Sequence, residues 1–354
     1  MRIDKYENER GMQNMGLLDA LQETMGNKVR VNKISDSERG MIFTIYGGMG
    51  TGKSTFAYEM AGEERGIWIC LERGISAFPN VISLPSTTFA EVKSNVEKVT
   101  NKRFLSKLQE DEYPYLIFDG AESMGLMIKK YIADNAGKEN LEDIAHGKGW
   151  SQWEELFENF IKGIIDSGVT AIFIFHEDET EEGKKVVAGN KRIVKPIVKN
   201  SDFVIHLEPQ GRDSDGKEIK STAVLIDDET AYAKNRFSQY FETNVIEEFS
   251  AEKFRKLYKQ AMKNLAEKKK VNLVSYEEKA EVYQGSGETY ESVTKEISEL
   301  LNKIPEDSYE DELFYKKVAK IFGEGIDLKD IRPNQLEGLI TLRDETLKIV
   351  EDMK

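Results

Sequence analysis

The nine residues "GGMGTGKST" at positions 47–55 constrain the fold of this chain more than any other stretch. Gly47, Gly52, Lys53 and Ser54 fit the pattern G-x-x-x-x-G-K-[ST], which here follows the apolar run "MIFTIY" and precedes a helical pattern. Glycines let the backbone curl so that its amide groups face a phosphate, and the helix N-terminus adds partial positive charge. The stretch therefore predicts an α/β domain with a phosphate-binding loop between a buried strand and a helix.

The same loop predicts the chemistry of its ligand, which we expect to be ATP with magnesium. Lys53 is expected to reach the β- and γ-phosphates, and the Ser54 hydroxyl is expected to bind Mg²⁺. A second Mg²⁺ ligand belongs at the end of a neighbouring strand, where "YPYLIFDG" supplies Asp119, although an aspartate there can also simply cap a turn. The residues expected to contact the nucleotide are Gly47, Gly48, Met49, Gly50, Thr51, Gly52, Lys53, Ser54 and Thr55.

Hydrolysis requires a group that activates water, and Gly120 follows Asp119 where many ring ATPases have a glutamate. Glu72 is the candidate base because it ends "GIWICLE", the apolar run after the P-loop helix, and Glu177 is next in line. His176 follows the run "TAIFIF", where a polar group can sense the γ-phosphate. The alternatives are a surface glutamate before a turn for Glu72 and an ordinary loop histidine for His176.

Short apolar runs at 41–46, 66–71, 115–118, 170–175 and 202–207 alternate with helical patterns. This alternation predicts a mainly parallel sheet flanked by helices over 41–244, with a hairpin around the turn-rich residues 209–219. Residues 1–40 are expected to form an arm with a possible interface helix at 15–25. A basic helix and a linker are expected over 245–290, and acidic helices over 291–354, with breaks near "KIPEDS" and "IRPNQ".

The composition disfavours several classes of protein. The single cysteine, Cys70, excludes an internal disulfide and fits a reducing cytoplasm. Three histidines far apart in the sequence make a structural zinc site improbable. No apolar run reaches 18 residues and the first residues lack a signal-peptide pattern, so neither a membrane span nor export is expected. The net charge of −14 disfavours a protein coated in nucleic acid but allows a local basic groove.

Six segments in a fixed order carry a family resemblance: "GGMGTGKST", "ICLERG", "YLIFDGAES", "GWSQWEELFENF", "FIFHED" and "AYAKNRF". Over about 41–240 the chain resembles the RecA-like ATPases of bacteriophages, in particular the Sak group related to RecA and RadA. The resemblance implies a RecA-like P-loop NTPase core, a homo-oligomeric ring or filament, and ATP-dependent recombination or repair on single-stranded DNA. It also implies the host cytoplasm as the location.

The segment "AYAKNRF" places two cations, Lys234 and Arg236, in an acidic protein. It resembles the Lys-Asn-Arg-Phe element of RadA, whose basic side chains serve at the interface between subunits. Two residues apart in a strand, both side chains point to one face. They are expected to reach ATP bound by the neighbouring subunit, as an arginine finger does. The alternative is a solvated edge strand protected by positive charge.

A DNA contact is expected in the basic segment 183–200, which follows His176 and contains no acidic residue. We interpret it as a loop, bending at Gly189, whose cations track a phosphate backbone; a plain solvated loop is the alternative. The cations are Lys184, Lys185, Lys191, Arg192, Lys195 and Lys199. A second basic segment at 253–270 either adds a DNA contact or balances the acidic tail. The tail suggests a protein-interaction module, with a single-strand-binding protein as one partner.

Other functions fit parts of the same pattern. A replicative-helicase-type ATPase or a helicase loader shares the core, and strand-separation activity distinguishes the helicase. A nucleotide-binding regulatory module shares the P-loop without turnover. A small-molecule kinase needs an arginine-rich lid, which the sequence lacks.

Overall fold

The computed structural model describes residues 16–25, 29–72, 74–109, 112–217, 219–283, 288 and 290–353. The chain divides into two compact units, one over residues 31–283 and the other formed by residues 1–30 together with 284–354. None of the helices in these described ranges is long and apolar enough to cross a membrane.

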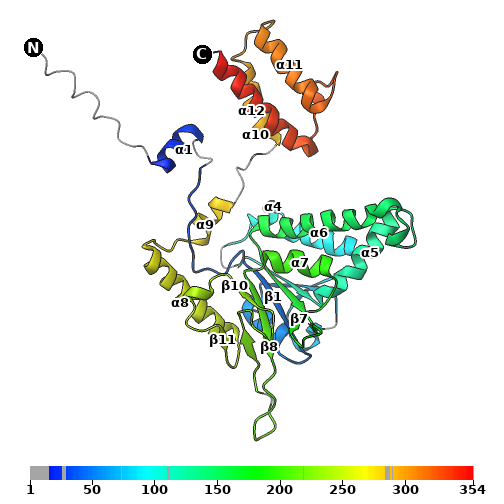
Figure 1. Cartoon of the computed structure of the whole chain (residues 1–354), viewed down its shortest axis with the longest axis vertical. Helices are drawn as coiled ribbons and strands as arrows, with labels where there is room; N and C mark the ends of the chain where they lie inside the picture. The colour runs from blue at the N-terminus through cyan, green and yellow to red at the C-terminus, as the bar shows by residue number, and fades with distance from the viewer. Residues whose placement is uncertain are drawn as a thin grey trace, which may run out of the picture. The chain divides into compact units, whose positions relative to one another are not determined.

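The first unit is built on one mixed sheet that is mainly parallel, as the sequence predicts (Figure 1). Six parallel strands form its body in the order β3-β2-β4-β5-β1-β8. They are β1 (Ile42–Gly47), β2 (Gly66–Cys70), β3 (Ile82–Pro85), β4 (Tyr115–Asp119), β5 (Thr170–Phe175) and β8 (Phe203–Glu208). The predicted hairpin is present, because β9 (Thr222–Val224) pairs antiparallel with β8 and is followed outward by β11 (Val245–Ile246).

Helices cover both faces of this sheet. Alternate residues of β1 serve opposite faces: Ile42 and Tyr46 pack into one apolar cluster, and Phe43 and Ile45 pack into the other. The first cluster is covered by α3 (Phe89–Val99), α5 (Met124–Asn135), α6 (Lys148–Ser167) and α7 (Lys191–Asn200). The second is covered by α2 (Lys53–Ala61) and α8 (Ala251–Lys269). The P-loop strand is therefore central and buried on both faces, which fixes the position of the loop that follows it.

Local signals read from the sequence define two helix starts. Thr88 and Glu91 form a reciprocal capping box at the start of α3. Ser250 caps α8 by accepting a hydrogen bond from the backbone N–H of Lys253. In both cases the side chain satisfies amide groups that have no partner within the helix.

The boundaries of the first unit lie outside the range 41–244 that the sequence suggests, because flanking segments pack on it. Glu38 pairs with Arg255 of α8 at 2.6 Å. Part of the expected linker forms α9 (Tyr276–Tyr283), and Tyr276 donates a hydrogen bond to the carbonyl of Gly168. Residues 31–40 and the basic helix thus belong to the core. Of the expected arm and linker, 1–15, 26–28, 284–287 and 289 lie outside the described residues; α1 (Leu17–Met25) carries exposed Leu17.

Three helices of the C-terminal region enclose a small core of their own, as expected for 291–354. They are α10 (Tyr290–Leu301), α11 (Tyr309–Phe322) and α12 (Leu336–Asp352). The breaks between them fall at the two predicted positions. Arg343 is buried in this bundle and contacts the carboxylates of Glu288, Glu296 and Asp344.

The interpretation of 183–200 as a loop is wrong. The segment forms β7 (Lys185–Val187), which pairs antiparallel with β6 (Glu177–Glu179), and then helix α7. Asn190 caps the helix, and Ile193 and Ile197, one turn apart, bury an apolar face against α5 and α6. Similarly, Lys234–Asn235 form a separate short strand, β10, rather than the end of β9.

Candidate active site

The phosphate-binding loop joins β1 to α2 with two glycines in the left-handed region, Gly50 (φ 75°) and Gly52 (φ 84°). Other residues are strained there, so the loop needs glycine at these positions. The Lys53 ammonium lies inside the loop and donates hydrogen bonds to the carbonyls of Gly47 (2.9 Å) and Gly48 (2.7 Å). Burial lowers the pKa of Lys53, and nearby carboxylates oppose that shift. They are Asp119, Glu122, Glu177 and Glu72, so four carboxylates converge on this one ammonium.

Ser54 and Asp119 form an oxygen pair beside the loop. The Ser54 hydroxyl lies 3.4 Å from both carboxylate oxygens of Asp119, which is only 5% exposed. Burial, and then the charge of Glu72, raise the pKa of Asp119, while Ser54 and Lys53 lower it. A divalent cation would relieve this cost, and a hydroxyl with a carboxylate is the hard oxygen set that Mg²⁺ prefers. The pair therefore fits the magnesium role predicted for it.

Glu72 and Asp119 fit side by side at the carboxyl ends of β2 and β4 because Gly120 and Gly74 have no side chains. Glu72 follows β2, which neighbours β4. A Cβ atom on Gly120 would overlap the side chain of Glu72, and one on Gly74 would overlap the carboxylate of Asp119. The glycine after Asp119 therefore has a physical reason: a glutamate there would displace Glu72. Glu72 is exposed at its place beside Asp119, and its role as the base stays a prediction.

His176 lies at the centre of this edge, held by a residue that sequence reasoning missed. The backbone N–H of His176 donates to Glu122 Oε1 at 3.2 Å, and ring Nδ1 lies 2.5 Å from the same oxygen. Ligand atoms of Glu72, Glu122 and His176 all lie within 4.8 Å of one another. The available signal was the glutamate of "DGAES", three residues after Asp119, where one 3-10 turn returns its side chain to the strand ends.

Glu177 also lies beside the loop. Its carboxylate is 3.1 Å from Nε2 of His206, a buried residue of β8, and within 3.9 Å of the Lys185 ammonium. A Cβ atom on Gly48 would be 3.7 Å from Glu177 Oε1. Both candidate bases, Glu72 and Glu177, thus border the P-loop edge.

A pocket of about 190 Å³ adjoins the P-loop on the side of β8. Thr51 and Thr55 line it from the loop and α2, and Phe249 lines it from the segment before α8. Lys220, from the β8–β9 connection, lies 3.5 Å from Glu59 of α2 at its border. Met49, at the tip of the loop, is 91% exposed. The pocket thus adjoins the P-loop with a lining of mixed polar and apolar residues.

Lys234 and Arg236 lie at the amino ends of the parallel strands, whereas the P-loop lies at their carboxyl ends. In the sheet register Asn235 faces Phe203, the first residue of β8, whereas Gly47 faces Leu207 near its other end. The Lys234 ammonium donates to the carbonyls of Val198 and Lys199, at the C-terminus of α7. Arg236 donates to the carbonyls of Asn200 and Ser201 and pairs with Asp202 at 3.3 Å. The two cations therefore cap a helix and do not reach the P-loop of their own chain.

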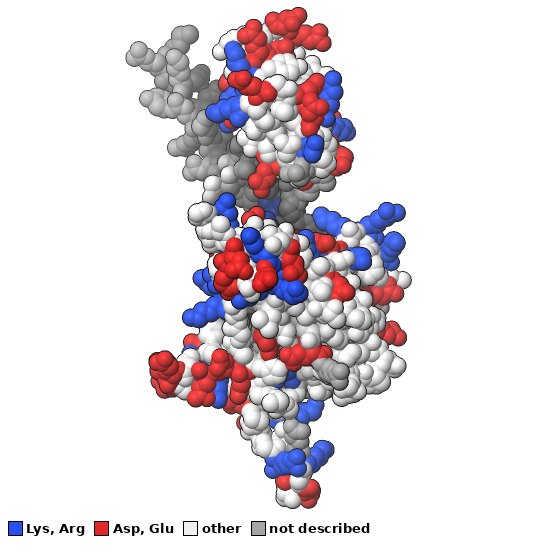
Figure 2. All heavy atoms as spheres, turned by 90° about the vertical axis from the view of Figure 1, so that its right-hand side faces the viewer, with Lys and Arg blue, Asp and Glu red and all other residues white. Residues whose placement is uncertain are grey.

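The six cations expected to bind DNA separate into two groups. Lys184, Lys185 and Arg192 pair with Asp227, Glu179 and Glu154 at 2.9, 2.6 and 3.2 Å. Lys191, Lys195 and Lys199 are exposed, make no ion pair with any described residue, and recur every fourth residue along α7. That spacing places all three on one face of the helix, here called the lysine stripe. The face that carries α5 and α6 differs from the lysine stripe, because basic and acidic side chains are interspersed on it (Figure 2).

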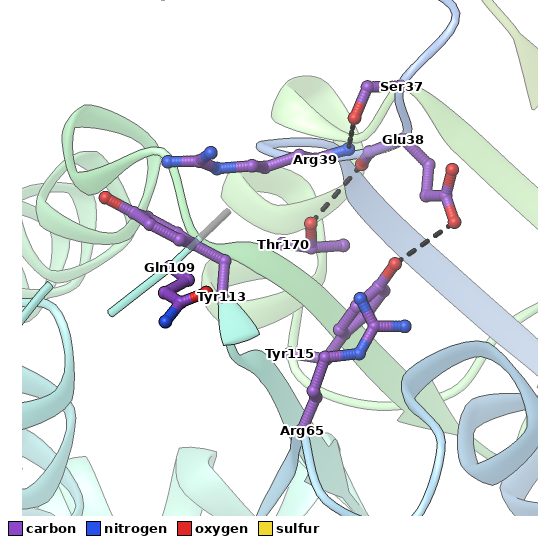
Figure 3. Close-up of a pocket in the computed structure, with 8 residues that line it drawn as sticks. All are labelled: Ser37, Glu38, Arg39, Arg65, Gln109, Tyr113, Tyr115 and Thr170. Carbon is purple, nitrogen blue, oxygen red and sulfur yellow. Dashed lines mark hydrogen bonds between the residues drawn. The ribbon is translucent and has the colours of Figure 1, made fainter. Parts of the chain in front are cut away.

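A second pocket, of about 550 Å³, lies at the amino ends of β4 and β5 (Figure 3). The Arg39 guanidinium lies 3.2 Å from the centre of the Tyr113 ring, and Tyr115 donates a hydrogen bond to Glu38. Tyr115 and Thr170 are the first residues of their strands, so this pocket is at the edge away from the P-loop. It is not part of the phosphate site.

Comparison with known proteins assigns the family. A model of the AAA domain matches residues 39–237, more than half of the chain. The chain belongs to this AAA domain family. The AAA domain match spans the P-loop, Asp119, His176 and both cations of "KNRF", so an AAA-type P-loop ATPase core is established and an NTPase activity is indicated.

Two further proteins are similar to this chain. The SPbeta prophage-derived uncharacterized protein YorG of Bacillus subtilis (strain 168) is 26% identical over 317 residues, covering 89% of this AAA domain protein and 95% of the relative. A crystal structure of the KaiC-like protein PH0186 from Pyrococcus horikoshii OT3 is 18% identical, with a TM-score of 0.31, and covers 55% of this chain and 88% of that one.

Proposed function

We propose that this protein hydrolyses ATP with magnesium in a homo-oligomer that acts on single-stranded DNA, in recombination or repair. The observation that carries the proposal is that Lys53, Ser54, Asp119 and Glu72 lie together at the carboxyl ends of β1, β4 and β2 of one sheet. Each of these groups has one role in phosphoryl transfer to water. The prophage origin of the similar Bacillus protein supports a bacteriophage setting.

Different residues of the chain have different roles in ATP hydrolysis. The loop amides and Lys53 hold the β- and γ-phosphates, and Ser54 and Asp119 hold the cation. Bound Mg²⁺ neutralises charge that develops between these phosphates. Glu72 accepts a proton from the attacking water, because it is the exposed carboxylate beside Asp119. The raised pKa of Asp119 means that the free site is electrostatically costly, so nucleotide with magnesium stabilises it.

The lysine stripe supports the assignment of DNA as the polyanion. Three exposed ammonium groups on one face of α7 can neutralise successive phosphates without giving up an ion pair to any residue that the structure describes. The N-cap of the helix, Asn190, comes two residues after Ala188, whose N–H donates to the carbonyl of His176. DNA bound to the lysine stripe would thus contact a helix whose start lies next to His176. This connection between the DNA and the ATP site favours ATP hydrolysis that DNA stimulates.

An oligomer with ATP between subunits is the second part of the proposal. Lys234 and Arg236 lie at the edge opposite their own P-loop, so any role at ATP requires the site of a neighbouring chain. Both are tied to the C-terminus of α7, which connects them to the helix that carries the lysine stripe. A second candidate function, a helicase-type or loader ATPase, uses the same core and differs in strand-separation activity.

The test is the ATPase rate with and without single-stranded DNA, for the wild type and for Lys53→Ala. We expect hydrolysis that single-stranded DNA stimulates and that Lys53→Ala abolishes. Binding of ATP without turnover would favour a nucleotide-binding regulatory module, and hydrolysis insensitive to DNA would remove DNA from the proposal.

A further inference from the structure

Glu122 has side-chain contacts that a solvated glutamate would not have. Its Oε1 accepts a hydrogen bond from the backbone N–H of His176 at 3.2 Å and lies 2.5 Å from the ring Nδ1 of the same residue. Its Oε2 is buried and has no hydrogen-bond partner within the described part of the chain. The Glu122 side chain is 18% exposed, against 43% for that of His176. The carboxylate is thus committed to the histidine, while the imidazole still reaches solvent.

We propose that Glu122 is a positioning residue for hydrolysis: it fixes His176 with Nδ1 protonated, so that Nε2 is the nitrogen presented to the γ-phosphoryl group. This inference rests on the proposed ATPase function. An ionised carboxylate has only acceptor atoms, so Nδ1 must carry the proton in this contact. Nε2, for which the described residues provide no partner, then accepts a hydrogen bond when the ring is neutral and donates one to a phosphoryl oxygen when the ring is an imidazolium.

The position of His176 in the sheet supports that direction of action. Tyr46 of β1 and Phe175 of β5 are register partners, so His176 lies alongside Gly47, the first residue of the P-loop. Glu122 follows β4, the strand on the other side of β5, and its contact therefore joins the ends of two adjacent strands. The same turn carries Ser123, which donates to Glu72 at 3.4 Å. One turn thus contacts both Glu72 and His176.

Glu122 also contacts the start of α7. Gly189 precedes the Asn190 cap and adopts φ 118°, and a Cβ atom there would lie 3.0 Å from Glu122 Cβ. The N–H of Ala188 donates to the carbonyl of His176 at 3.0 Å. The segment that begins the helix therefore packs on both members of the Glu122–His176 pair. A shift of α7 would therefore move Glu122, the residue that orients the imidazole.

The first experiment reads the proton directly and does not depend on ATP hydrolysis. The chain has three histidines, so a long-range ¹H–¹⁵N correlation spectrum contains three imidazole patterns, and His176→Gln identifies one of them. We expect His176 in the wild type to have Nδ1 protonated, and Glu122→Ala to convert the neutral ring to the form with its proton on Nε2. A neutral His176 with an unprotonated Nδ1 in the wild type would overturn the inference without any variant.

The second experiment asks whether Glu122 acts through His176. Glu122→Ala should lower kcat about 10-fold or more, as loss of a partner that orients a functional imidazole does, with little change in KM. In a His176→Gln background the same substitution should have almost no further effect, because its target is gone. Glu154→Ala, which removes another carboxylate partner of the α7 region, is the matched control. Full additivity of the two losses would contradict the inference, whereas an inactive wild type would refute only the ATPase.

Discussion

The Ser54 hydroxyl lies equidistant, at 3.4 Å, from the two carboxylate oxygens of Asp119, which is almost completely buried. This arrangement lowers the stability of the folded protein. Burial and the neighbouring Glu72 raise the pKa of Asp119, so the ionised carboxylate destabilises the folded chain relative to the unfolded one. We expect much of that cost to be recovered when a cation binds.

Asp119→Asn should therefore stabilise the protein and remove its function together. Because the folded pKa is raised, the native state binds more protons than the unfolded state above the ordinary aspartate pKa, and stability falls as pH rises through that range. At neutral pH without magnesium, Asp119→Asn should raise Tm above that of the wild type. Magnesium with ATP should raise Tm of the wild type but not of the variant. A lower Tm for the variant would contradict the electrostatic account.

Glu72→Gln should separate binding from hydrolysis. The amide keeps the shape of the side chain but cannot accept a proton, so kcat should fall about 10²-fold or more. Affinity for a fluorescent ATP analogue should be nearly unchanged, because the loop and Lys53 are intact. Glu177→Gln is the comparison, since Glu177 also borders the loop. If Glu177→Gln loses turnover and Glu72→Gln retains it, the base has been assigned to the wrong carboxylate.

Gly120→Ala tests whether Glu72 needs the space beside Asp119. A Cβ atom there would overlap the Glu72 side chain, and φ of 80° adds backbone strain of about 1–3 kcal/mol for a residue other than glycine. Gly137→Ala is a matched control, with φ of 64° and open space around the added atom. Both variants should lower Tm, but only Gly120→Ala should lower kcat. Equal kcat in the two variants would mean that Glu72 is not held in place by this contact.

Lys234 and Arg236 should act in trans or not at all, because they lie at the edge opposite their own P-loop. The double variant Lys234→Ala with Arg236→Ala should lose hydrolysis while still binding nucleotide, and should also lower Tm through the lost caps of α7. Mixing it with Lys53→Ala should restore part of the ATPase rate, since some interfaces then combine an intact P-loop with intact cations. No recovery in demonstrated mixed oligomers would leave the two residues as structural caps alone.

The P-loop, the parallel sheet and the two helix caps were predictable because each depends on residues close together in sequence. Gly50, Gly52 and Lys53 define a local geometry, and alternation of short apolar runs with helices defines the sheet. The pairing of Glu122 with His176 was not, because 54 positions separate the two and only the strand order brings them together. The error at α7 had another cause: charge dominated the interpretation, although Ile193 and Ile197 carried a helical period.

The same helix provides the most direct test of the central claim, that single-stranded DNA on this protein drives ATP hydrolysis. The measurement is the rate of phosphate release with and without single-stranded DNA, for the wild type and for the variant with Lys191, Lys195 and Lys199 changed to Gln. A control with Lys102, Lys107 and Lys138 changed to Gln loses the same charge from other exposed positions. The account predicts unchanged basal hydrolysis in both variants. It also predicts loss of DNA stimulation in the stripe variant alone, with the salt slope of DNA binding reduced by about 0.7 for each lost contact. Equal stimulation of the stripe variant and the control, or no stimulation of the wild type, would contradict it.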